Sequence, residues 1–294
     1  MKKIFLCIVV FICSFQVMKA QNTPKLYLSM YDLGNQAESF VKNNNIGYVR
    51  LVGGAYIDPD NDMIVNESLL RAQISKLFPN SNDSGIGILD WEGKAMNILS
   101  SASADDPKFL TALQQYQRAV RIGQTMRPNV RWAVYGLPFR EYWNINSKWE
   151  ERCMKLLPLL KMCDIITPSL YSLYPASVGK GYDEKYVSGN VQLALKIGLM
   201  IGKPVYPYIW HRLPDDSLIP KDQFLKHTGS ILRQSYKGNK VAGLIWWGSD
   251  LYSLNVKAKP LLMEIGSKSN FTPYHDKWFI DYAGGLLNEM KNSN

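Results

Sequence analysis

Two acidic residues, Asp90 and Glu92, stand two positions apart in the segment GIGILDWEGK at 85–94. The apolar run that precedes them, 86–89, is typical of a β-strand buried on both faces, and carboxylates are rarely buried without a partner. Side chains at i and i+2 of a strand point to the same side, so both acids are expected to face one space, with Cα atoms roughly 6–7 Å apart. Carboxylates this close repel each other, which raises one pKa and allows that group to hold a proton at neutral pH. A protonated acid beside an ionised one is what the cleavage of a glycosidic bond requires.

The two acids are expected to differ in role. Glu92 lies further out and has the longer side chain, which suits a proton donor to a leaving oxygen. Asp90 lies deeper and is expected to stay ionised. A D-x-E pair alone is weak evidence, because a carboxylate at a strand end often caps the next helix or pairs with a lysine, here Lys94. The catalytic interpretation therefore depends on what the other strand ends carry.

Aromatic residues supply that support. The candidate strands are seven short apolar segments, at 26–30, 47–52, 85–89, 130–135, 165–171, 205–209 and 243–247. Tyr135, Tyr171, Trp210 and Trp247 fall at or just after the ends of four of them, and Trp91 lies between the two acids. Aromatic faces bind the apolar faces of sugars, so all five are candidate substrate contacts. Any one of them alone would more often be structural, and it is their gathering at one rim that favours a glycan site.

Amphipathic helical patterns separate the strands. They lie at 66–78, 107–125, 147–163, 186–201 and 221–236, the first behind a candidate N-cap at Asn66, and the tail 268–294 is expected to end in a helix that covers the barrel. Alternating strands and helices predict a parallel α/β sheet. Because polar and aromatic residues fall at nearly every strand end, a TIM-type barrel with about seven parallel strands is favoured over an open doubly wound sheet. The sequence contains no linker or repeat, so 21–294 is expected to form a single domain.

The first 20 residues predict export. Two lysines, an almost wholly apolar stretch at 4–17 and a small residue at Ala20 are typical of a signal peptide, and no later stretch is long enough to span a membrane. Cleavage would lower the formal charge from +9 to +6, because three lysines lie in that segment. This charge suits an anionic partner such as an acidic polysaccharide, but no basic run resembles a nucleic-acid-binding arm. A secreted, periplasmic or cell-surface location is expected.

The remaining residues favour neither a metal nor a cofactor. The three histidines are scattered without metal-ligand spacing, and no phosphate-binding loop or G-x-S-x-G motif is present. Removal of the signal leaves Cys153 and Cys163, which are expected to be buried free thiols.

In these residues and the motifs around them, the chain resembles the hyaluronidases, glycoside hydrolase family 56. Five segments match the family's strand-end motifs in order, and together they extend over 26–250: ILDWEGK, RWAVYGLPF, DIITPSLY, KPVYPYIWHR and LIWWGSD. The resemblance implies a distorted barrel and an endo-β-N-acetylhexosaminidase in which the acetamido oxygen of the substrate is the nucleophile. The chain differs from the family in three respects. Gly93 and Lys94 follow the acid pair in place of the family's residues, the family's disulfide framework is absent, and the chain is shorter.

The resemblance also implies roles for single residues. Glu92 would be the general acid and then the base, and Asp90 would orient the acetamide N–H and stabilise the developing positive charge. Tyr135 and Tyr171 would hydrogen-bond around that group, and Trp247 would form the pocket wall against its methyl. The glycan would be of the hyaluronan or chondroitin type or another N-acetylated polymer.

Two other interpretations remain open at this stage. A conventional two-carboxylate glycosidase would use Asp250 or Glu141 as the nucleophile or base, although the interpretation of Asp250 as a helix N-cap is favoured. The second interpretation is a non-catalytic glycan-binding protein built on a hydrolase barrel, although such a protein would normally lose the acid at Glu92.

Overall fold

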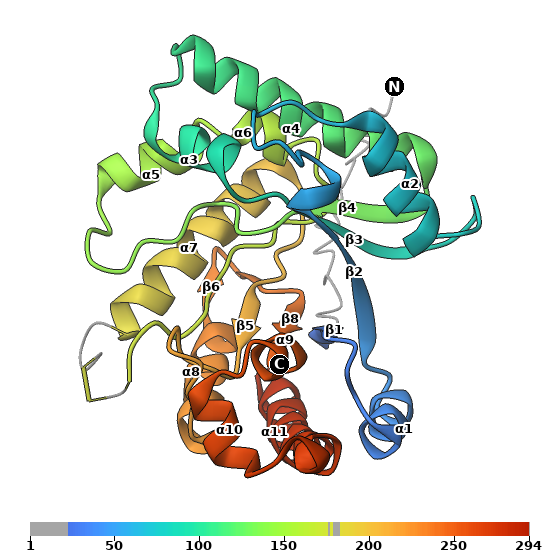
Figure 1. Cartoon of the computed structure of the whole chain (residues 1–294). Helices are drawn as coiled ribbons and strands as arrows, with labels where there is room; N and C mark the ends of the chain where they lie inside the picture. Colours follow the sequence, from blue (N-terminus) through green and yellow to red (C-terminus); the bar gives the residue numbers. More distant parts are fainter. Residues whose placement is uncertain (1–22, 176, 179–182, 294) are drawn as a thin grey trace, which may run out of the picture.

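Six parallel strands form one curled sheet in the order β4-β3-β2-β1-β8-β5 (Figure 1). The computed structural model describes residues 23–175, 177–178 and 183–293, so the expected signal peptide lies outside the described residues. The strands are β1 Lys25–Ser29, β2 Gly47–Gly53, β3 Gly85–Asp90, β4 Val130–Val134, β5 Tyr208–Trp210 and β8 Gly243–Trp247. A separate two-stranded hairpin joins β6 Ser235–Tyr236 to β7 Asn239–Lys240. The parallel α/β barrel expected from the sequence is confirmed.

The expected seventh strand, 165–171, is not a continuous strand. Isolated parallel bridges instead join Thr167 to Tyr135, beyond β4, and Ser169 to Tyr208 in β5, so the segment lies between the two edges of the sheet. Pro168 interrupts this segment, and Pro204 and Pro207 precede β5. Because proline has no N–H to donate, neither stretch can form a regular ladder, and the ring is distorted here.

The helices cover the outside of the sheet (Figure 1). Their bounds are α1 Asn35–Asn43, η1 Gly54–Tyr56, α2 Glu67–Leu77, α3 Lys94–Ser101, α4 Pro107–Met126, α5 Ser147–Met154, α6 Leu157–Leu160, α7 Asp183–Ile201, α8 Lys221–Arg233, α9 Asp250–Asn255, α10 Lys259–Ile265, η2 Lys268–Asn270 and α11 Phe271–Asn292. Asn66 is the N-cap of α2, since its side chain accepts from the Leu69 N–H at 3.1 Å. The expected helix at 147–163 is divided into α5 and α6, because Pro158 cannot continue a helix from the residues before it.

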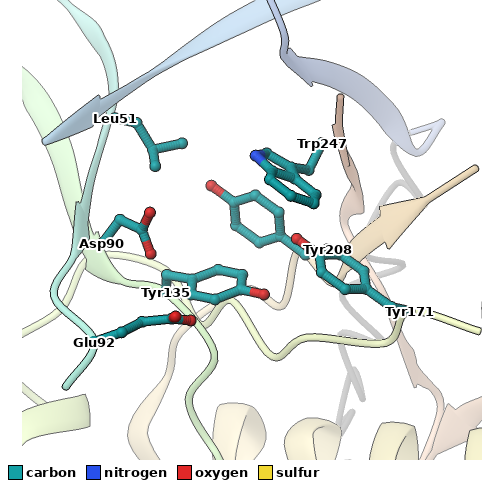
Figure 2. A pocket seen from close by; sticks show the side chains of 7 residues that line it. All are labelled: Leu51, Asp90, Glu92, Tyr135, Tyr171, Tyr208 and Trp247. Atoms are coloured by element: carbon teal, nitrogen blue, oxygen red, sulfur yellow. The ribbon is translucent and has the colours of Figure 1, made fainter. Parts of the chain in front are cut away.

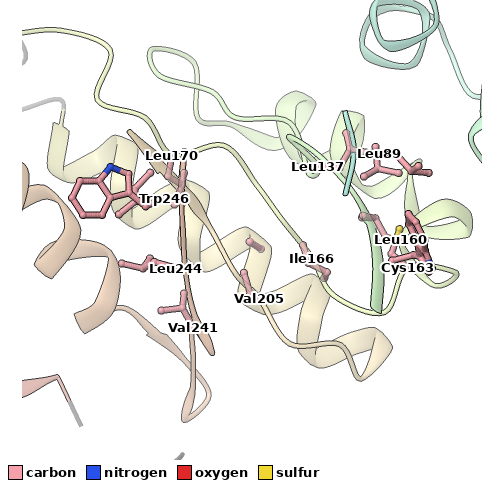
Figure 3. Close-up of a cluster of buried hydrophobic side chains, with 14 of the residues drawn as sticks. Leu89, Leu137, Leu160, Cys163, Ile166, Leu170, Val205, Val241, Leu244 and Trp246 are labelled. Carbon is pink, nitrogen blue, oxygen red and sulfur yellow. The ribbon is translucent and has the colours of Figure 1, made fainter. Parts of the chain in front are cut away.

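The core has two layers, one on each face of the sheet. Figure 3 shows part of the outer layer between the strands and the helices, which includes Leu89, Leu244 and Trp246. The inner layer fills the barrel with alternate strand residues such as Ile86, Ile88 and Ile245. Burial on both faces explains why the strands appear as continuous apolar runs.

Cys153 and Cys163 are free and buried, as expected, and burial raises the pKa of each thiol to about 12. Within the described ranges, no helix combines the length and the apolar character needed to cross a membrane. In the same ranges, no group of three or more histidine, cysteine or acidic side chains is arranged to hold a metal ion.

Candidate active site

Asp90 and Glu92 lie together at the carboxyl end of the barrel, at the edge of a cavity of about 120 Å³ (Figure 2). Asp90 is the last residue of β3, and Glu92 follows two positions later, so both side chains point to the same side, as the sequence predicts. The cavity lining is completed by residues from five other segments, namely Leu51, Tyr135, Tyr171, Tyr208 and Trp247. Carboxyl ends of parallel strands converge at one mouth, which brings these distant residues into contact with one space.

Burial changes the pKa of Asp90, the deeper acid of the pair. It raises the pKa of Asp90 to about 7, and the negative charge of Glu92 adds to this effect. The sequence had suggested that the deeper acid would stay ionised. Desolvation instead favours the protonated form of the deeper carboxyl, because burial removes more water from it.

A wall of packed aromatic rings faces the acids (Figure 2). The rings of Tyr171 and Trp247 are stacked, with centroids 5.7 Å apart and planes at 13°. Trp210 contacts both, at 5.6 Å from Tyr171 and 4.9 Å from Trp247, but it is not one of the residues that line the cavity. Trp210 therefore supports the wall from behind. Tyr135 lies 6.3 Å from Tyr171 and extends the wall toward the acids.

Hydrogen bonds fix part of this wall. The Tyr135 hydroxyl donates to Ser169 Oγ at 3.2 Å, and Arg140 Nη1 donates to the same oxygen at 2.7 Å. The Arg140 guanidinium also lies over the Tyr171 ring, 5.6 Å from its centroid. These contacts hold two rings of the cavity in one orientation.

Tyr208 is a site residue that the sequence interpretation missed. Its ring lines the cavity and packs edge-on against Tyr135 at 4.9 Å. Its hydroxyl is buried close to the Ser29 hydroxyl, and within the described part of the chain it makes no hydrogen bond of full geometry. A buried hydroxyl without a partner is available to a ligand. The signal is present in VYPYIW at 205–210, since Tyr208 and Trp210 are two apart and share a strand face, but the sequence prediction includes only Trp210.

The structure corrects the expectation for Trp91. Its side chain is 1% exposed, stacks on Tyr116 with centroids 4.4 Å apart, and donates from Nε1 to Asp58 at 3.2 Å. The reason is the alternation of side chains: between two acids that face the cavity, the middle residue points into the helical layer. Trp91 is a core residue that holds the loop beyond β2, and it does not line the cavity.

Hyaluronidases are among the known proteins that are similar to this chain. No protein-family model matches the chain. Hyaluronidase-1 of Mus musculus is 23% identical over 279 residues, which cover 76% of this chain and 59% of the relative. Hyaluronidase-1 of Rattus norvegicus is 23% identical over 230 residues, which cover 64% and 50%. The crystal structure of bee venom hyaluronidase superposes with a TM-score of 0.63 at 15% identity, over 91% of this chain and 99% of that one.

The chain is a divergent relative of the hyaluronidases. A second structure, bee venom hyaluronidase in complex with a hyaluronic acid tetramer, superposes with a TM-score of 0.55 at 16% identity, over 86% of this chain and 99% of that one. At these identities the structural likeness establishes the fold. The chain spans between half and three fifths of the length of the two curated relatives, at 59% and 50%.

The other two candidate carboxylates of this hyaluronidase relative are engaged elsewhere. Asp250 is fully buried and pairs with Arg212, with His211 Nε2 at 2.9 Å and with His275 Nε2 at 3.3 Å. It is the first residue of α9, behind the N-cap Ser249, and its carboxylate is engaged by His211 and Arg212, so the N-cap interpretation is wrong. Glu141 accepts hydrogen bonds from three backbone N–H groups at 142–144 and pairs with Arg152 at 3.2 Å. Neither is among the described residues that line the cavity.

Proposed function

We propose that this protein is a glycoside hydrolase that cleaves β-N-acetylhexosaminide linkages in a glycosaminoglycan-like polysaccharide of the hyaluronan or chondroitin type. The observation that carries the proposal is the placement of Asp90 and Glu92 opposite an aromatic wall within one cavity. The names of its relatives support it, as does the net charge of +6 left once the first 20 residues are removed. The first 20 residues would direct export, and the exported protein would then begin at Gln21.

The chemistry uses the acid pair and the substrate's own amide. Glu92 donates its proton to the glycosidic oxygen as the C1–O bond breaks, and the acetamido oxygen forms a bond to C1 from the opposite face. Water then attacks C1 of the cyclic intermediate and transfers a proton to Glu92, while the bond between C1 and the acetamido oxygen breaks and the acetamide is restored. Two displacements at C1 retain its configuration. Substrate-assisted enzymes of this kind need no second carboxylate as nucleophile, which suits a cavity where Asp250 and Glu141 are engaged elsewhere.

Asp90 would stabilise the charge that develops on the amide. In its ionised form it accepts a hydrogen bond from the acetamide N–H and faces the positive charge of the cyclic intermediate. Burial makes this ion unfavourable in the free protein, where its pKa is raised to about 7. A nearby cation reverses that penalty, so the interaction is stronger in the transition state than in the ground state, as catalysis requires.

The aromatic wall would hold the acetamide in the attacking position. The stacked rings of Tyr171 and Trp247 offer an apolar surface to its methyl group. The unpaired Tyr208 hydroxyl can donate to the acetamido oxygen or to a sugar hydroxyl. Such positioning accelerates an intramolecular attack by lowering its entropic cost.

The decisive experiment is the Glu92→Gln variant, assayed for the release of reducing ends from hyaluronan and chondroitin. Loss of a general acid is expected to lower turnover by about 10²- to 10⁴-fold, with an unchanged melting temperature. Glu67→Gln, at a partly exposed acid that starts α2 and lines neither of the two cavities beside the acid pair, is the matched control and should keep full activity. Full activity in Glu92→Gln would remove this residue from the mechanism.

A thiazoline mimic of the cyclic intermediate tests the nucleophile separately. Strong competitive inhibition of the wild-type protein is expected if the acetamido oxygen attacks C1. Weak inhibition alongside active hydrolysis would point instead to a nucleophile supplied by the protein.

A further inference from the structure

The imidazole of His211 lies behind the aromatic wall, on the outer face of the sheet. His211 follows Trp210 at the end of β5 and is 0% exposed. Its Nδ1 accepts a hydrogen bond from Trp246 Nε1 at 3.1 Å, and its Nε2 lies 2.9 Å from Asp250 Oδ2. Trp246 immediately precedes Trp247, and Asp250 follows Trp247 by three residues. One side chain therefore holds the chain on both sides of Trp247.

The two partners fix the protonation state of this imidazole. An indole N–H only donates hydrogen bonds, so the Nδ1 that accepts from Trp246 carries no proton. Asp250 pairs with Arg212, and an ionised carboxylate only accepts, so Nε2 carries the single proton and donates it to Asp250. Burial acts in the same direction, since it lowers the pKa of His211. His211 is a neutral bridge whose two hydrogen bonds have a fixed direction.

Asp250 gives this bridge a fixed end. Its other oxygen accepts from Arg212, whose guanidinium also pairs with Glu264 of α10 at 3.0 Å. The next backbone N–H, that of Leu251, donates to Asp32 beyond β1 at 3.0 Å. Buried charges of this kind add little net stability, because the loss of hydration offsets most of their attraction. Their gathering in one place therefore points to a role in geometry.

The same two strand ends carry part of the aromatic wall on their inner face. Trp210 and Trp247 are paired residues of β5 and β8, and their ring centroids are 4.9 Å apart. Because successive residues of a strand point to opposite faces, His211 and Trp246 face the helices, where the His211 ring packs on Trp278 of α11 at 4.3 Å. A shift of β8 against β5 would break the hydrogen bond on the outer face and move Trp247 on the inner face.

We infer that His211 is a positioning residue for Trp247. Its bridge from β8 to the start of α9 fixes the ring against which the substrate's acetamide is held. The inference rests on the proposed function and adds to it a residue that lines neither cavity beside the acid pair. His211 acts only through Trp247, and a misplacement of about 1 Å near the reacting atoms can lower a rate by about 10²-fold.

Replacement of His211 by leucine and by glutamine separates the two hydrogen bonds from the bulk of the ring. Leucine removes both bonds, whereas glutamine can accept from Trp246 and donate to Asp250. His211→Leu should lower kcat on hyaluronan oligosaccharides by at least about tenfold and raise the inhibition constant of the thiazoline mimic by a similar factor. KM should change by less than about threefold, because it also includes contacts along the rest of the polymer. His211→Gln should restore kcat to within about threefold of the wild type.

Arg127→Met is the matched control for lost stability. Arg127 is 7% exposed, and its Nε donates to the Phe78 carbonyl at 2.6 Å. It lies just before β4, at the opposite end of the barrel from the acid pair. This variant should melt at a lower temperature and keep the kcat of the wild type when both are assayed well below their melting temperatures.

Trp246→Phe removes the same hydrogen bond from the other side while it keeps an aromatic ring. It should lower kcat by at least about threefold, and it decides the test if His211→Leu does not fold. Wild-type kcat and thiazoline inhibition in the folded variant would overturn the inference. The same conclusion would follow if kcat were as low in His211→Gln as in His211→Leu, or if Arg127→Met lost as much kcat. A wild-type protein that hydrolyses none of these oligosaccharides would overturn the proposed function, and this inference with it.

Discussion

Replacement of Asp90 by asparagine is expected to stabilise the fold while it removes activity. The side chain is partly buried, and burial raises its pKa from 3.8 to about 7. The folded protein therefore binds a proton at Asp90 more tightly than the unfolded chain does. Below pH 3.8 the group is protonated in both states and has no effect. As the pH rises toward 7, the unfolded chain ionises freely and the folded state is progressively destabilised.

The size of the effect follows from the change in pKa. At 1.36 kcal/mol per pH unit, the wild-type protein loses about 4 kcal/mol at pH 8 relative to pH 3, or about half of that once solvent that enters the cavity is counted. Asparagine has nearly the same shape and no charge, so Asp90→Asn recovers this loss. For a chain of this size, a gain of about 2 kcal/mol corresponds to a melting temperature at least about 4 °C higher at pH 8.

The assay is thermal melting of the wild type and Asp90→Asn at pH 4 and pH 8, with hydrolysis measured on the same samples. Asp60→Asn is the control, because Asp60 is an exposed carboxylate on the neighbouring loop. The stabilisation should be near zero at pH 4, full at pH 8 and absent in Asp60→Asn. A melting temperature that is lower in Asp90→Asn at both pH values, or equal to wild type at both, would refute the reasoning.

Two further substitutions separate structural from functional polar groups. Asp250→Asn removes the fully buried partner of Arg212, which keeps its ion pair with Glu264 at 3.0 Å, and should lower the free energy of unfolding by about 1.5–3 kcal/mol in urea titrations; a loss below about 1 kcal/mol would contradict the role assigned to this pair. Tyr208→Phe removes a hydroxyl that has no partner within the described residues, so stability should be unchanged or improved. Its kcat/KM should nevertheless fall by about five- to thirtyfold, the value of one hydrogen bond of about 1–2 kcal/mol to the substrate, and unchanged kinetics would exclude that contact.

Much of the barrel could be read from local patterns. Short apolar runs bounded by turn residues predicted five strands within one or two residues of their observed ends, because two-sided burial leaves a continuous apolar signal. The acid pair was also predictable, since side-chain alternation alone puts Asp90 and Glu92 on one side. Tyr135 and Trp247 line the cavity because they stand at strand ends, a position visible in the sequence, and Tyr171 lines it from the end of the bridged segment 165–171.

Other features were decided by the tertiary structure. The apolar run 165–171 is not a strand, because its pairing depends on neighbours that proline interrupts. The same alternation that pairs the acids should have placed Trp91 in the core, yet its aromatic character favoured a sugar contact. Asp250 follows a strand like a helix cap, but only the folded chain brings Arg212 and two histidines to it.

The sequence by itself determined which groups can do chemistry and which side of the barrel they occupy, because these depend on residue type and on the two-residue period of a strand. Only the tertiary structure decided how much water each group loses. Desolvation depends on atoms contributed by segments distant in sequence, and it places the raised pKa on Asp90. The same distant segments, 54–61 and 93 among them, form a second cavity beside the acids.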